Sequence, residues 1–177
     1  MTMTQKCHVA LLLLLGCALT PGRAETVNFD GTLIEDACEV YPGDEAVELD
    51  FGTVIDKYLY LNTRTHSQPF AIRLINCDLA LGREVKVTFS GTESAALPGR
   101  LALDGTSQAS GVAIGLETAG GAPLALNTGK YTQALQTGSN NTVNLKAYVQ
   151  GEPLALQSRT VGRGAFTATA TFMLEYE

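Results

Sequence analysis

Residues 164–177, GAFTATATFMLEYE, alternate between two kinds of side chain over their whole length. One parity carries the apolar set Phe166, Ala168, Ala170, Phe172, Leu174 and Tyr176, and the other carries Thr, Met and Glu. A period of two over such a length predicts a β-strand with one buried face. Because strand edges are normally paired or covered, we expect a cover for this strand, either from this chain or from another.

The rest of the chain repeats this pattern in shorter segments. Alternation predicts strands at 47–51, 69–77, 84–90, 111–117 and 141–150, with short ones at 100–103 and 123–126. Residues 57–65 are predicted to be an edge strand or loop and 127–139 a loop, and no segment has a helical period. Short strands separated by Gly, Asn and Pro are typical of an all-β sandwich or barrel.

Residues 1–24 have the features of a secretory signal. Lys6 precedes the apolar run Val9–Leu15, and Gly22 and Ala24 supply small residues at a cleavage site. The apolar run is too short for a transmembrane helix, which needs about 20 residues. An alternative is a lipoprotein signal that ends at Cys17.

Cleavage after Ala24 would leave two cysteines, Cys38 and Cys77. An even number in an exported protein predicts one disulfide, formed in an oxidising compartment. The long loop between them makes this worth roughly 4 kcal/mol in the chain-entropy model. A metal site is disfavoured, because there is no C-x-x-C motif and His66 is the only histidine after residue 24.

The formal charge of the chain is −6, and removal of Lys6 and Arg23 gives −6 − 2 = −8. Such an acidic domain argues against nucleic acid and anionic membrane surfaces as partners and is compatible with a basic protein.

No catalytic constellation is visible in the sequence. Motifs for nucleophilic, zinc-dependent or phosphate chemistry are absent, and Asp104-Gly105 is better explained as a turn. His66 stands alone in a polar run and is expected to be exposed. We therefore predict no enzyme activity, no metal and no cofactor, and we favour binding or assembly as the class of function.

A second one-sided segment precedes the first of the paired cysteines. In residues 25–36, ETVNFDGTLIED, the positions Val27, Phe29, Gly31 and Leu33 share one parity. This segment could simply pair within the sheet of its own domain. Gly31 on the apolar face packs nothing, which suits a close approach of its backbone to another surface.

Together these features resemble the pilin subunits of chaperone–usher pili. The resemblance spans the mature chain and rests on the N-terminal alternating segment, the cysteine pair, Gly164 as the fourteenth residue from the end, and the penultimate Tyr176. Two segments, FAIRLINC at 70–77 and VTFSGTESAALPG at 87–99, most resemble the minor tip adaptor subunits of P-type pili.

The resemblance implies an incomplete immunoglobulin-like β-sandwich of six strands that lacks the seventh. Residues 1–24 would be the signal peptide, 25–36 a donor-strand extension and 37–177 the pilin domain, with Cys38 and Cys77 as the family's disulfide. Val27, Phe29, Gly31 and Leu33 would enter a neighbouring subunit. The acceptor groove and chaperone contact would comprise Gly164, Phe166, Ala168, Ala170, Phe172, Leu174, Tyr176 and Glu177.

The implied partners are a periplasmic chaperone, an outer-membrane usher and neighbouring pilus subunits, in a fimbrium at the cell surface. Ala168 and Ala170 are small for groove walls and could leave room for large donor side chains. The alternative function is a secreted β-sandwich module that binds carbohydrate as an adhesin. A pilus adhesin normally carries a further receptor domain, for which this chain is too short.

Overall fold

The computed structural model describes residues 35–177, except Ser139. These residues belong to one compact unit, Ile34–Glu177. The predicted signal peptide and the predicted donor positions Val27, Phe29, Gly31 and Leu33 lie outside them.

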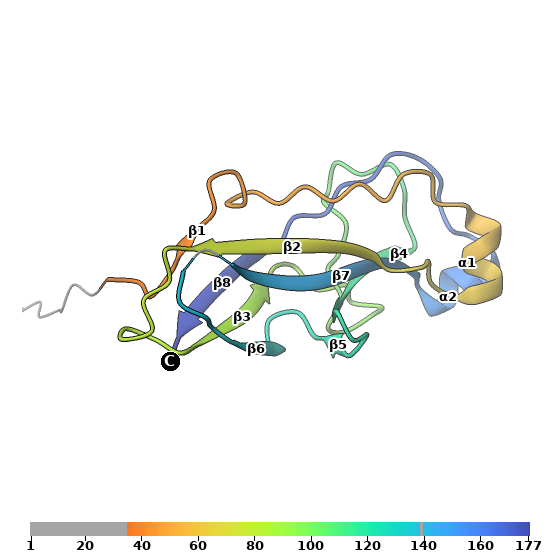
Figure 1. The fold of residues 1–177 in the computed structure, drawn as a ribbon. Coiled ribbons are helices and arrows are strands. Elements are labelled where there is room, and N and C mark those ends of the chain that lie inside the picture. The colour runs from red at the N-terminus through yellow and green to blue at the C-terminus, as the bar shows by residue number, and fades with distance from the viewer. Residues whose placement is uncertain (1–34, 139) are drawn as a thin grey trace, which may run out of the picture. The chain divides into compact units, whose positions relative to one another are not determined.

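Two antiparallel sheets make up the described domain (Figure 1). The first has the order β1 (Glu39–Val40), β2 (Gln68–Ile75), β7 (Asn141–Gly151), β4 (Val112–Thr118) and β5 (Pro123–Leu124). The second has the order β6 (Lys130–Ala134), β3 (Glu84–Ser90) and β8 (Thr171–Tyr176). The expected all-β sandwich is confirmed.

The core lies between the two sheets because each long strand turns alternate side chains inward. Val85 and Val87 of β3 are fully buried, as are Ile72 of β2 and Val143 of β7. The polar residues between them face outward, as the period of two requires. The register pairs Phe89 of β3 with Phe172 of β8, so β8 extends the inner face of the second sheet.

The cysteine pair is joined in a disulfide, as predicted. Cys38 and Cys77 are bonded, with their Cα atoms 4.1 Å apart. The bond joins the residue before β1 to a residue two positions after the end of β2. None of the helices among the described residues has the length and apolar character needed to cross a membrane.

Two short helices interrupt the β structure, where we predicted none. Helix α1 (Asp56–Asn62) occupies the segment predicted to be an edge strand or loop, and α2 (Pro153–Ser158) follows β7. Seven and six residues are too few for a helical period to emerge from a sequence. Leu59 anchors α1 because its side chain is 1% exposed.

Three other predicted boundaries were wrong. The terminal ladder begins only at Thr171, because residues 164–170 bond instead to the loop at 104–108: the amide of Asp104 donates to the Thr167 carbonyl at 2.8 Å. Residues 47–51 alternate in burial but form no ladder among the described strands. Conversely, β6 forms inside the predicted loop at 127–139, where polar side chains obscure the alternation.

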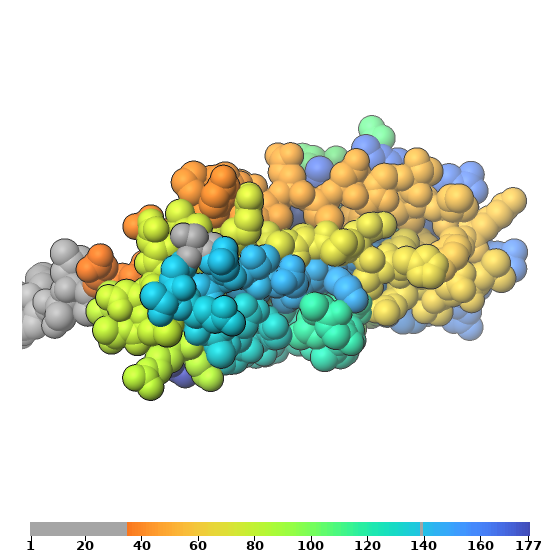
Figure 2. All heavy atoms as spheres, in the orientation of Figure 1, coloured from red at the N-terminus to blue at the C-terminus, as the bar shows by residue number. Residues whose placement is uncertain are grey.

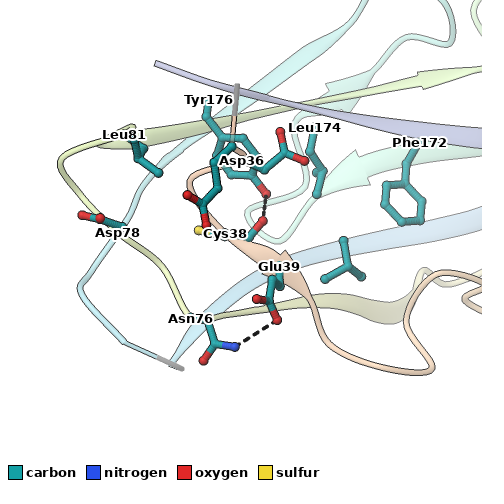
Figure 3. Close-up of a pocket in the computed structure, with 11 residues that line it drawn as sticks. Asp36, Cys38, Glu39, Asn76, Asp78, Leu81, Phe172, Leu174 and Tyr176 are labelled. Carbon is teal, nitrogen blue, oxygen red and sulfur yellow. Dashed lines mark hydrogen bonds between the residues drawn. The ribbon is translucent and has the colours of Figure 1, made fainter. Parts of the chain in front are cut away.

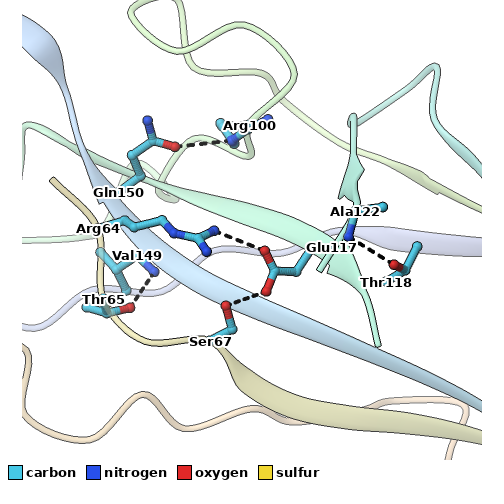
Figure 4. Close-up of polar contacts among 9 residues, drawn as sticks. All are labelled: Arg64, Thr65, Ser67, Arg100, Glu117, Thr118, Ala122, Val149 and Gln150. Carbon is cyan, nitrogen blue, oxygen red and sulfur yellow. Dashed lines mark hydrogen bonds and ion pairs between the residues drawn. The ribbon is translucent and has the colours of Figure 1, made fainter. Parts of the chain in front are cut away.

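A polar network lies over the first sheet (Figure 4). Glu117 of β4 is 4% exposed, and its carboxylate accepts hydrogen bonds from Arg64 at 2.9 Å and Ser67 at 2.5 Å. The Arg64 guanidinium also stacks 4.1 Å from the ring centroid of Tyr148. Burial raises the pKa of Glu117, but these two hydrogen bonds, together with the charges of Arg64 and Lys146, lower that pKa overall.

Candidate strand-docking groove

The last strand has one paired edge and one edge without a partner among the described strands. β8 pairs with β3 from Thr171 to Tyr176, and no other described strand lies against it. Its inward side chains are only half-buried. They continue the row begun upstream, and all six pack against the core: Phe166, Ala168, Ala170, Phe172, Leu174 and Tyr176. We call residues 164–176 the C-terminal wall.

A second row of half-buried apolar side chains faces this wall. It begins in β1, the edge strand of the other sheet, continues after it, and comprises Val40, Val47, Leu49, Phe51 and Val54. Figure 2 shows residues 41–55, in orange, running along the upper surface of the described domain. We call residues 39–54 the N-terminal wall and the space between the two walls the edge groove. The edge strands β1 and β8 border this space, and each has only one strand partner among the described strands. The apolar side chains of both walls pack against the core.

A salt bridge holds the N-terminal wall to β2. Asp44 is 7% exposed and binds the Arg73 guanidinium through both oxygens, at 2.6 and 2.8 Å, and accepts the Arg73 amide at 2.8 Å. The guanidinium lies 3.9 Å from the ring centroid of Tyr41. Hydrogen bonding to Arg73 lowers the pKa of Asp44 to about 2.

At the β1 end the groove opens into a cavity of about 610 Å³ (Figure 3). Phe172, Leu174 and Tyr176 line it from the C-terminal wall, and Val40 lines it from the N-terminal wall. The Tyr176 hydroxyl donates to the Cys38 carbonyl at 3.3 Å, which ties the C-terminal wall to the residue just before β1. Burial, and secondarily the charge of Asp36, raise the pKa of Tyr176 to about 12.

A smaller cavity of about 280 Å³ lies at the opposite end. Val54 and Leu59 line it from one side and Phe166 and Gly164 from the other. Gly164 has a φ of +144°, and a Cβ there would lie 2.5 Å from the Cβ of Gln108. Only glycine fits this bend, which turns the chain into the C-terminal wall.

The chain terminus is fastened to β3 rather than left free. The Glu177 carboxylate side chain forms an ion pair with Lys86, and a terminal oxygen of Glu177 accepts the Glu84 amide at 2.9 Å. The hydrogen bond from Lys86 lowers the pKa of the Glu177 side chain. Across the described residues, no group of three or more His, Cys, Asp or Glu side chains could hold a metal ion.

Comparison with known proteins gives this geometry a context. The sequence pattern of the family described as fimbrial protein matches residues 27–177. The chain belongs to the fimbrial protein family. It is 37% identical to the fimbrial adapter PapK of Escherichia coli, covering 93% of this chain and 96% of PapK. It is 34% identical to the major MR/P fimbria protein of Proteus mirabilis, covering 96% of this chain and 97% of that protein.

The fold of this fimbrial subunit also matches solved structures. The P pilus rod subunit PapA superposes with a TM-score of 0.68 at 23% identity, covering 80% of this chain and all of PapA. The chain is thus a structural subunit of a pilus, exported through the periplasm to the cell surface. Its partners are neighbouring subunits, a periplasmic chaperone and an outer-membrane usher.

The structure brings most of the predicted groove residues of this fimbrial subunit into two clusters. Gly164 and Phe166 lie at the smaller cavity, whereas Phe172, Leu174 and Tyr176 lie at the larger one. Ala168 and Ala170 lie between them in sequence and pack against the core. Glu177 points away from both cavity linings, toward Lys86.

Sequence reasoning missed the N-terminal wall. The alternation of Val47, Leu49 and Phe51 was visible but was assigned to an ordinary strand. The pairing of Lys86 with Glu177 was also missed, because it depends on the register of β8 against β3.

Proposed function

We propose that the edge groove receives a β-strand donated by another protein, which completes the sandwich. The observation that carries this proposal is the pair of facing walls, each with a row of half-buried apolar side chains and each following a sheet edge. An extended segment laid between them would gain main-chain hydrogen bonds from β8. Its alternate side chains would fill the cavities at the two ends.

The magnitude of the burial supports strand donation. Three donated side chains of Val, Phe or Leu type would contribute roughly 1.5–3 kcal/mol each, or about 5–9 kcal/mol together. A whole domain is stable by only about 5–15 kcal/mol. The subunit without its donated strand is therefore marginally stable, and a periplasmic chaperone supplies a strand in the interim.

The donor in the next step of assembly is an N-terminal extension of the same kind as residues 25–36. In this chain Val27, Phe29 and Leu33 would fill pockets of a neighbouring subunit, and Gly31 would permit close approach. Residues 1–24 serve as the signal, 25–36 as the donor extension and 37–177 as the pilin domain.

The subunit acts without enzymatic chemistry, as a minor adaptor near the tip of an adhesive pilus. The resemblance to PapK, a fimbrial adapter, supports this position. A carbohydrate-binding adhesin module is less favoured, because the relatives that match along nearly their whole length are fimbrial subunits.

The test separates donor from acceptor. The mature subunit carrying Phe29→Asp and Leu33→Asp is co-expressed with its chaperone and usher. We expect the chaperone complex to form normally, while insertion into a neighbouring subunit is lost. Phe172→Asp in the C-terminal wall should instead abolish the chaperone complex.

The matched control places the same charges on the opposite parity, as Asn28→Asp and Thr32→Asp, and should leave assembly intact. Loss of the chaperone complex in the Phe29 and Leu33 variant would contradict the assignment of donor and acceptor. A chaperone-free subunit that is monomeric and cooperatively folded, with no strand added, would contradict the incomplete sandwich.

A further inference from the structure

The larger cavity of the edge groove combines an apolar floor with an acidic rim (Figure 3). Leu174, Phe172 and Val40 contribute apolar side chains. The rim is formed by four carboxylates that line the same cavity: Glu35, Asp36, Glu39 and Asp78. No Lys, Arg or His is among the described residues that line it.

None of the ion pairs among the described residues involves these four carboxylates. Glu39 accepts a hydrogen bond from the Asn76 amide at 2.9 Å, and Asp78 accepts the amide of Ala80 at 2.8 Å. Both donors are neutral, so they position the carboxylates without cancelling their charge. Lys86 already pairs with Glu177 on the outer side of β3. All four rim residues are exposed, so the rim presents negative charge to whatever enters the cavity.

The chain's own extension has the wrong charge for this site. Residues 25–36 contain Glu25, Asp30, Glu35 and Asp36 and no Lys, Arg or His. Carboxylates stand at both ends of the segment, so a free peptide of residues 25–36 brings a carboxylate to the rim in either direction. Like charges placed together at an interface disfavour binding and slow association.

We propose that the edge groove selects by charge: its occupant is an extended, alternating apolar segment with Lys or Arg at the end that lies over the rim. That segment comes from a different protein, and the extension of a second copy of this chain is disfavoured. The inference rests on the proposed function, because it assumes that the groove receives a strand. It makes the subunit a connector between unlike neighbours rather than a building block of a homopolymer.

The test uses the full mature subunit purified in complex with its chaperone. It is mixed with a peptide of residues 25–36, with a cationic version carrying Glu25→Lys and Asp36→Lys, or with a neutral version carrying Glu25→Gln and Asp36→Asn. The rate of chaperone displacement is followed by size-exclusion chromatography. The apolar residues are the same in all three peptides, so only charge differs.

We expect the cationic peptide to displace the chaperone about tenfold faster than the native peptide at low salt, with the neutral peptide between them. At about 0.01 M salt the Debye length is about 30 Å and at about 1 M it is about 3 Å, so the preference should vanish at high salt. Neutralising the rim with Asp36→Asn, Glu39→Gln and Asp78→Asn should also remove the rate advantage of the cationic peptide. Glu93→Gln, at an exposed position outside both walls and outside the cavity lining, should preserve it.

Three results would overturn the charge selection. The first is equal rates for the three peptides at low salt. The second is a faster rate for the cationic peptide that persists at about 1 M salt, where the Debye length is about 3 Å. The third is a faster rate for the cationic peptide that persists in the rim variant. Failure of every peptide to displace the chaperone would count instead against strand donation itself, so the two proposals can fail separately.

Discussion

The ring of Phe51 lies 6.3 Å from the ring of Phe166, centroid to centroid, and the contact joins the two walls of the edge groove. The rings are tilted by 33°. Aromatic pairs at this separation contribute about 0.5–1.5 kcal/mol beyond the area that they bury. The groove is thus open at its two ends and bridged by side chains near the smaller cavity.

This contact predicts a measurable coupling. Phe51→Ala and Phe166→Ala should each destabilise the subunit filled with a donor peptide, and the double variant should lose about 0.5–1.5 kcal/mol less than the sum. Denaturant unfolding of the four complexes gives the coupling energy. Additivity within about 0.5 kcal/mol would mean that the filled groove no longer contains the ring contact.

The Asp44–Arg73 salt bridge predicts a loss of stability in acid. The pKa of Asp44 falls from 3.8 to about 2 in the folded protein, so its contribution is complete above about pH 4 and disappears as the pH drops through 2. Asp44→Asn should therefore lower the Tm of the chaperone complex at pH 7, and the gap to wild type should narrow toward pH 2. In an Arg73→Gln background the same substitution should have a much smaller effect at every pH, and an undiminished gap there would refute the assigned cause.

The network around Glu117 predicts an asymmetry between its partners. Arg64→Ala leaves a buried carboxylate without its cation, and we expect a loss of about 1–3 kcal/mol. Glu117→Gln retains the shape and can still bond to Ser67 while removing the buried charge, so it should cost less. Thermal unfolding of the two chaperone complexes tests this order, and a larger loss for Glu117→Gln would contradict it.

Gly115 in the middle of β4 predicts a steric effect. A Cβ there would lie 2.2 Å from the Tyr148 ring, which covers the glycine. Gly115→Ala should lose about 1–3 kcal/mol through overpacking, which corresponds to roughly 2–12 °C in Tm. Gly105→Ala is the control, because a Cβ at that position meets nothing within 4 Å. Equal Tm values for the two variants would show that Tyr148 moves aside without loss.

Alternation predicted which side chains of residues 164–177 face inward, because a period of two fixes the face whether or not the strand is paired. It did not predict where the ladder begins, since Asp104 and Ser107 compete for the backbone of Thr167. Helix α1 was missed because only Leu59 of its seven residues is buried, so its sequence shows no row of apolar residues with a helical period.

The acidic rim likewise could not be predicted from sequence patterns. Glu39 and Asp78 are far apart in the chain and meet through the pairing of β1 with β2 and the nearby disulfide. A local pattern cannot show a site that depends on two such connections.

The position of the disulfide has a mechanical consequence. β1 is held to β2 by only two residue pairs, Glu39 with Ile75 and Val40 with Leu74. In a pilus under tension, a pull transmitted through residues 35–36 would load such a short ladder from its end and peel it. The covalent bond from Cys38 to Cys77 lies directly in that path, so the force passes to the C-terminal end of β2 and bypasses the N-terminal wall. The lining of the groove is thereby shielded from the traction that the fibre carries.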